Sequence, residues 1–133
     1  MICTWDHREL IEALLRTYNL DPQIVETVDD VAARSTELGY PDDNPFRTAR
    51  SICTPEGTAY ILISAEISDD MIESAKAAMA WRGFDDEVQR LSTDELFLEH
   101  LVLHEIACHV LGTGDQGPRD RWAFEHVSRT RSS

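Results

Sequence analysis

Hydrophobic residues recur every three or four positions near the start of the chain, and this spacing predicts two helices. The first covers about residues 4–18, with Thr4 in position to cap its free amides. The second covers about residues 22–38, because Asp21 can cap it, Pro22 suits its first turn and Gly39 ends it.

Similar patterns predict three helices in the second half of the chain. Ser68 can cap a helix that runs to about Trp81. The sequence Ser92-Thr93-Asp94-Glu95 forms a capping box, in which Ser92 and Glu95 satisfy each other's amides. The helix that follows, about residues 93–111, is apolar on all sides, so we expect it to be central and buried. A last helix is expected over about residues 119–129.

Two β-rich segments lie between these helices. Residues 49–54 (ARSICT) and 58–67 (TAYILISAEI) are joined by Pro55-Glu56-Gly57, which predicts an antiparallel hairpin with a bulged turn. A lone hairpin is marginal in water, so it must pack against the helices. The expected fold is α+β, a mostly helical single domain over residues 1–133, with one hairpin against the central helix.

The net charge of the chain limits the classes of partner that it is expected to bind. The formal net charge is −13, and residues 1–99 hold 21 acidic residues against 8 basic ones. Such a field repels phosphate backbones, so direct binding of nucleic acid is not expected. It favours a basic protein surface as a partner, although acidity also serves solubility alone.

Cysteine usage and hydropathy indicate a cytoplasmic protein. The three cysteines, Cys3, Cys53 and Cys108, are odd in number and show no CxxC spacing, which is typical of a reducing environment. The N-terminus lacks the basic start and apolar core of a signal peptide. Glutamates and histidines interrupt the most apolar stretch before it reaches the roughly 18 residues of a membrane span.

That stretch, residues 96–115 (LFLEHLVLHEIACHVLGTGD), carries the candidate chemistry. It holds three of the five histidines, His100, His104 and His109, and Glu105 follows His104 directly. The motif is HExxxH, one residue longer than the HExxH motif that binds zinc on one helix face. Five residues advance a regular helix by about 500°, so His104 and His109 would lie about 140° apart around its axis.

Three arrangements would restore a zinc site on this helix. A π-bulge would absorb the extra residue and bring His109 under His104. Cys108, four residues after His104, could be the second ligand, because thiolates bind zinc well. His100 and His104 are also spaced by four and could bind the metal together with Cys108. In the competing interpretation these residues are ordinary buried side chains that hydrogen-bond within the core.

The sequence HEIACHVLGTGD, residues 104–115, resembles the metzincin zinc peptidases. Their pattern is HExxHxxGxxH, and an aspartate replaces the last histidine in the snapalysin-like branch. The resemblance covers about a dozen residues. It implies zinc as cofactor, with His104, His109 and Asp115 as ligands and Glu105 as the general base toward a zinc-bound water. It also implies that Gly112 turns the chain.

Other zincins take their third ligand from the helix after the motif. Asp120 and Glu125 are the corresponding candidates in this chain. The strand ahead of the motif also suits a zincin, in which an edge strand pairs with extended peptide substrate.

Two hypotheses of function follow from these observations. The first is a zincin-like metalloprotein, a small or degenerate zinc-dependent peptidase that uses His104 and Glu105 on a peptide or protein. The second is a small acidic binding protein without catalysis. It would block a basic nucleic-acid-binding surface, as phage-type anti-CRISPR or DNA-mimic inhibitors do. In a third interpretation, the chain is a structural helical domain in which the histidine cluster has no function.

Overall fold

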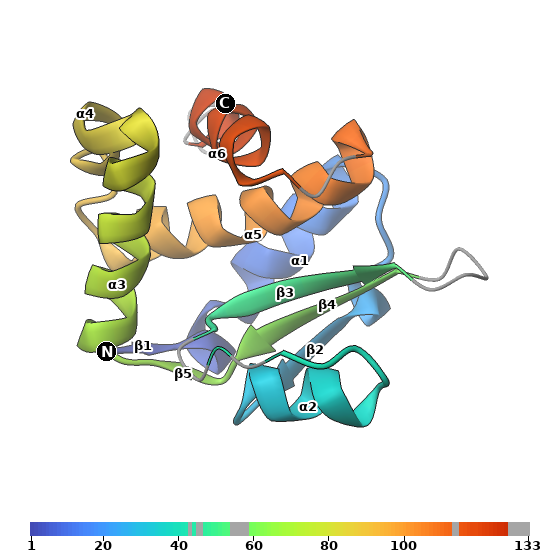
Figure 1. Ribbon diagram of the computed structural model, residues 1–133. Helices are drawn as coiled ribbons and strands as arrows, with labels where there is room; N and C mark the ends of the chain where they lie inside the picture. The colour runs from blue at the N-terminus through green and yellow to red at the C-terminus, as the bar shows by residue number, and fades with distance from the viewer. Residues whose placement is uncertain (43, 45–46, 54–58, 113–114, 128–133) are drawn as a thin grey trace.

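The computed structural model describes residues 1–42, 44, 47–53, 59–112 and 115–127. This part of the chain is a mostly helical α+β fold organised around the long helix α5 (Asp94–Leu111) (Figure 1). An antiparallel pair of strands packs against α5, as the sequence pattern predicts. No helix among the described residues is both long and apolar enough to cross a membrane.

Helix α5 is central because apolar residues occupy nearly its whole circumference. Of its 18 residues, ten are buried. Thr93 caps the helix by accepting a hydrogen bond from the amide of Leu96 at 3.1 Å. The cap is therefore Thr93 and not the expected Ser92. Gly112 ends the helix with a φ of 67°, a left-handed conformation that glycine adopts without strain.

The larger sheet contains β2 (Val25–Val28), β3 (Ala49–Cys53) and β4 (Ala59–Ser64) in the order β2-β4-β3. Strand β3 is antiparallel to β4, whereas β2 is parallel to it. A second, two-stranded sheet pairs β1 (Ile2–Cys3) with β5 (Glu66–Ile67). The turn expected at residues 55–57 lies outside the described residues.

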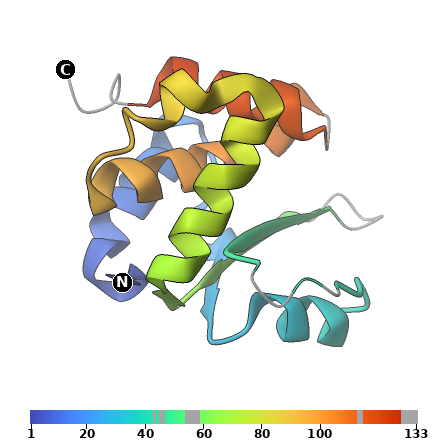
Figure 2. The same cartoon turned by 60° about the vertical axis from the view of Figure 1, so that its left-hand side comes forward.

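Alternating residues send the two faces of the larger sheet into different cores. Ala49, Ile61 and Ile63 pack into the main core with α5 and with α1 (Arg8–Thr17). Ile52 and Leu62 face the other way and pack with α2 (Val31–Glu37). Figures 1 and 2 show α2 on one side of the sheet and α1 with α5 on the other. The strands are thus covered on both faces, as their continuous apolar runs require.

The remaining helices stand beside the sheet and over α5. Helix α3 (Asp69–Met79) is capped by Ser68, as predicted. After it the chain kinks at Gly83, whose φ is 100°, and the short helix α4 (Asp85–Val88) follows. Helix α6 (Gln116–His126) packs along α5 and begins three residues before the expected start. Helix α3 and helix α6 form two of the walls of the site described below.

The predicted second helix, residues 22–38, is wrong in its first half. A 3-10 turn, Pro22–Ile24, leads into strand β2, and only Val31–Glu37 is helical. The segment 24–28 is rich in β-branched residues, which favour a strand when a partner is present, and β4 supplies that partner. Asp30 caps α2 by accepting a hydrogen bond from the Ala33 amide at 3.0 Å.

Candidate binding site

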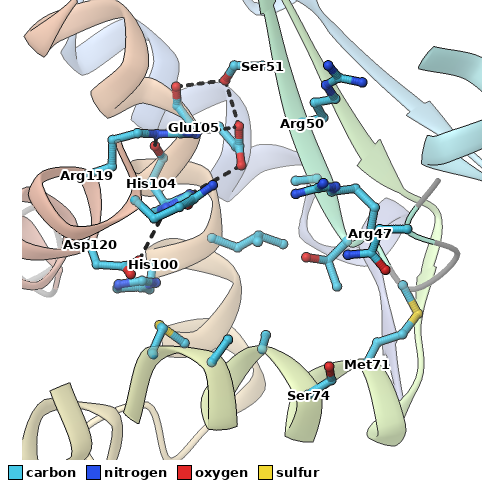
Figure 3. Close-up of a pocket in the computed structure, with 18 of the residues that line it drawn as sticks. Arg47, Arg50, Ser51, Met71, Ser74, His100, His104, Glu105, Arg119 and Asp120 are labelled. Carbon is cyan, nitrogen blue, oxygen red and sulfur yellow. Dashed lines mark hydrogen bonds and ion pairs between the residues drawn. The ribbon is translucent and has the colours of Figure 1, made fainter. Parts of the chain in front are cut away.

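A cavity of about 610 Å³ lies between β3, α3, α5 and α6. We call it the β3–α3 cleft. Figure 3 shows His100, His104 and Asp120 at one end of it and Arg47 with Ser74 at the other. The volume is typical of clefts that bind ligands.

One wall of the cleft is the edge of strand β3. Four consecutive residues, Thr48 to Ser51, line the cleft. Consecutive residues of a strand point to opposite faces of the sheet, so a cavity that meets all four touches the strand along its edge. Among the described residues, β4 is the one strand that pairs with β3. The other edge of β3 is therefore open to a further strand.

The hydrogen-bond register identifies the main-chain groups at this edge. The Ser64 amide donates to the Thr48 carbonyl at 2.9 Å, which sets the alternation of the ladder between β3 and β4. Thr48 and Arg50 therefore direct their main-chain groups towards β4. The N–H and C=O groups of Ala49 and Ser51 point the opposite way, towards the open edge.

The opposite wall is one face of α3. Residues spaced by three and four along the helix line the cleft: Met71, Ser74, Ala75, Ala78 and Met79. Ser74 and Ala78 are exposed, and their small side chains leave the space between helix and strand open. Ala77 is also exposed but does not line the cleft.

Glu105 joins three of the surrounding elements. Its Oε2 accepts hydrogen bonds from Ser51 of β3 at 2.7 Å and from Arg119 of α6 at 3.0 Å, while Oε1 lies 3.3 Å from His104 Nδ1 (Figure 3). Burial raises the pKa of Glu105. The hydrogen bond from His104 and the positive charges of His104 and Arg119 outweigh burial and lower this pKa to about 2. Glu105 is thus a buried carboxylate with both oxygens engaged.

A second buried carboxylate, Asp120, lines the cleft beside His104. Its Oδ2 forms an ion pair with Arg82 at 2.6 Å, and its Oδ1 lies 3.3 Å from His104 Nε2. The His104 ring consequently sits between Glu105 and Asp120 and links α5 to α6. Each of these carboxylates also has its own arginine, so the charges at this end are compensated.

His100 is a further buried titratable group beside the cleft. Burial is the main reason that its pKa falls to about 3, and the charge of His104 lowers it further. The ring is therefore neutral at pH 7. It hydrogen-bonds to the backbone of Asp120 and packs on Phe124 with ring centroids 4.1 Å apart. Its buried Nε2 has no hydrogen-bond partner among the described residues.

Two arginines that share one carboxylate line the cleft at the start of β3. Arg47 donates to Asp42 through Nε at 2.8 Å and through Nη2 at 3.3 Å. Arg50 lies 3.8 Å from the same carboxylate. The Arg50 guanidinium points away from the cleft (Figure 3) and donates to Ser35 and to the Tyr40 carbonyl. The Asp42 side chain is only 3% exposed.

The zincin interpretation is wrong. Among the described residues, no group of three or more His, Cys, Asp or Glu side chains is arranged to hold a metal ion. Helix α5 is regular through the whole motif, so no π-bulge brings His109 under His104. The extra residue therefore keeps the two imidazoles on different sides of the helix.

The other residues that the sequence singled out are scattered around α5 and α6. His104 meets Asp120, and His100 lies beside them, as the spacing of four residues predicts. His109 and Cys108 are partly exposed near the end of α5. The remaining two candidate ligands are exposed: Asp115 directly precedes α6, and Glu125 lies near the end of that helix.

Sequence reasoning missed the features that form the cleft. Arg47, Arg82 and Arg119 carry no local motif, because each gains its partner from a residue distant in sequence or from a loop. The free edge of β3 depends on strand order, which the alternation of residues does not reveal. One feature could have been recognised in the sequence: small residues on one face of a helix leave room beside it. In α3 that face carries Met71, Ser74, Ala75 and Ala78.

Comparisons with known proteins leave the chain without an assigned family. It matches no protein-family model, and no curated protein or solved structure is detectably similar to it. The function must therefore be inferred from the geometry of the cleft.

Proposed function

We propose that this protein is a protein-binding module that takes an extended segment of a partner as an additional strand on β3. The single observation that carries the proposal is the open edge of β3 inside the β3–α3 cleft. The main-chain groups of Ala49 and Ser51 offer hydrogen bonds there in the alternation that a new strand needs.

The surroundings of the edge suit selective pairing. Strand edges that are long, flat and fully exposed promote aggregation, and proteins protect them. Here α3 stands opposite the edge, so a partner must enter between helix and strand. Each main-chain hydrogen bond would contribute about 0.5–1.5 kcal/mol, and contacts with the face of α3 would add apolar burial. The bonds from Ser51 to Glu105 hold the strand in place before a partner arrives.

Two alanine substitutions on α3 test the proposal. Random peptides displayed on phage are selected on the full chain, and their binding to Ala78→Trp and Ala77→Trp is compared. Both alanines are exposed and adjacent, but Ala78 alone lines the cleft. We expect Ala78→Trp to abolish binding and Ala77→Trp to preserve it. Equal binding by both variants, or no selected peptide, would contradict strand addition in the cleft.

The acidic surface supports a second candidate, a protein that blocks a basic nucleic-acid-binding surface. Carboxylates on α3 and α4 are exposed, among them Asp70, Glu73, Asp85 and Asp86. The whole chain holds 25 acidic residues against 12 lysines and arginines. A partner held in this way should be released by salt and by neutralising these four acids, whereas Ala78→Trp should not affect it. The reverse pattern supports strand addition.

A further inference from the structure

We propose that the segment bound in the β3–α3 cleft places a neutral hydrogen-bond donor, such as the hydroxyl of a threonine, against Nε2 of His100. This inference rests on the proposed strand addition and names the kind of side chain that the cleft selects. His100 lines the cleft, yet its residue is only 3% exposed and its Nε2 has no hydrogen-bond partner among the described residues. Buried polar atoms are rarely left unpaired, so this atom indicates where a ligand supplies the missing bond.

One other residue of the cleft has a buried ring nitrogen without a hydrogen bond in the described part of the chain, namely His104. Its Nε2 lies 3.3 Å from the carboxylate of Asp120, so it faces an opposite charge when the ring is protonated. Nε2 of His100 has no such ion-pair partner among the described residues. His100 is therefore the group in the cleft wall that most needs a ligand.

The bond that the His100 ring already makes determines what Nε2 can do. His100 donates a hydrogen bond to the backbone of Asp120, and because Nε2 is unpaired this bond uses Nδ1. A neutral imidazole carries one proton, which Nδ1 then holds. Nε2 is consequently left with a lone pair, and it accepts a hydrogen bond from a ligand.

The charges around the ring favour a neutral donor over a cationic one. Burial, and then the positive charges of His104, Arg82 and Arg90, lower the pKa of His100 to about 3. The same surroundings disfavour the ammonium group of a lysine or the guanidinium of an arginine. A carboxylate has no proton to donate at pH 7. A hydroxyl or an amide N–H meets the requirement without bringing a charge into the cleft.

An added strand would direct side chains towards His100. Ala49 packs into the main core and Ser51 bonds to Glu105, so both side chains of β3 face α5. Neighbouring strands of a sheet share their two faces, so alternate side chains of the bound segment would also face α5. Figure 3 shows Ser51, Glu105, His104 and His100 in succession from β3 towards α3, which is where the additional strand would lie.

Nε2 is covered in the free protein, so the bound side chain must displace a neighbour. Met71 and Met79 of α3 line the same cleft, and methionine rearranges readily because it is unbranched and has three rotatable bonds. The small side chains of Ala75 and Ala78 leave space on the same helix face. Binding then needs a change of methionine rotamer, with both helices in place.

The test starts from a peptide that is selected on the full chain and shifts the Ala49 and Ser51 amides in NMR spectra. Each side chain of this peptide is replaced in turn by threonine and by valine, which have nearly the same shape but differ in one hydroxyl. We expect threonine to bind about tenfold more tightly than valine at one position that faces α5. At the other positions, threonine should have no such advantage.

Histidine variants identify the acceptor. His100→Phe keeps a ring against Phe124 but removes the lone pair, so the preference for threonine should disappear. His7→Phe is the control, because His7 is a partly exposed histidine outside the cleft, and it should keep the preference. In the parent protein, the nitrogen NMR resonance of His100 Nε2 should shift when the threonine peptide binds and not when the valine peptide binds. This second measurement does not depend on the folding of His100→Phe.

Two results would overturn the role of His100 and leave strand addition standing. One is equal binding of threonine and valine at every position, with the Nε2 resonance unmoved by either peptide. The other is a preference for threonine that survives in His100→Phe. If no peptide shifted the Ala49 and Ser51 amides, both proposals would fail.

Discussion

The Ser51 hydroxyl donates a hydrogen bond to Glu105 at 2.7 Å, and this bond ties the edge strand β3 to the central helix α5. Glu105 also accepts from Arg119, so the same carboxylate holds α6 against α5. Three walls of the cleft therefore depend on one buried group. The residue that the sequence motif nominated as a catalytic base occupies a position that stabilises the cleft.

Removing the Glu105 carboxylate should be severely destabilising. Glu105→Ala leaves the buried Arg119 guanidinium without its partner, and breaking a buried pair in this way costs about 3–5 kcal/mol. Ser51→Ala removes one neutral donor and should cost about 1–2 kcal/mol. Urea unfolding followed by circular dichroism measures both values. A loss below 0.5 kcal/mol for Glu105→Ala, on the order of a surface substitution, would show that the network is not structural.

Because His100 is buried and neutral, we expect the protein to lose stability on mild acidification. The pKa of His100 is about 3 in the fold against 6.5 when unperturbed, so between these values the unfolded chain binds the additional proton. The free energy of unfolding should therefore fall as pH decreases from about 6.5 towards 3, by at most about 1.4 kcal/mol per pH unit. His100→Phe keeps a ring against Phe124 and should flatten this slope between pH 6.5 and 5.

Glu105 should add a second loss at lower pH. Its pKa is lowered to about 2 from 4.5, so its contribution is complete above about 4.5 and disappears as pH falls towards 2. Urea unfolding of the parent protein and of His100→Phe across pH 7 to 2 separates the two effects, because the variant should keep only the loss below about pH 4.5. If the free energy of unfolding changed equally with pH in both proteins above pH 5, His100 would not be the cause of the loss of stability on mild acidification.

Two adjacent residues, Ser92 and Thr93, should differ in how much they stabilise the start of α5. Thr93 accepts the hydrogen bond from the Leu96 amide, whereas the sequence pattern favours Ser92 as the cap. Thr93→Ala should lower stability by about 1 kcal/mol, and Ser92→Ala should change it by less than about 0.5 kcal/mol. Thermal and urea unfolding of the two variants provide the comparison. A larger effect at Ser92 would place the helix start one residue earlier.

Much of the fold was predictable because it depends on local signals. The continuous apolar surface of residues 94–111, its capping residues and Gly112 specify the central helix without information from elsewhere in the chain. The hairpin strands were likewise visible as β-branched runs. Strand β2 was not, because Val25, Thr27 and Val28 also fit a helical spacing and gain their strand conformation from pairing with β4.

The candidate site was predictable only in part. His100 and His104 both line the cleft with their rings side by side, as expected for residues four apart on a helix. The motif then suggested a metal where the structure has arginines, because a sequence does not reveal which charge arrives from another helix. Arg119 reaches Glu105 from α6, and Arg82 reaches Asp120 across 38 residues of chain.

Hydrogen exchange at β3 tests the central claim most directly. In the free protein, the amides of Arg50 and Ile52 should exchange slowly because they bond to β4, whereas those of Ala49 and Ser51 should exchange faster. On binding of a selected peptide, we predict that Ala49 and Ser51 become protected and that Arg50 and Ile52 change little. A bound peptide that leaves the Ala49 and Ser51 amides unprotected would contradict strand addition at this edge.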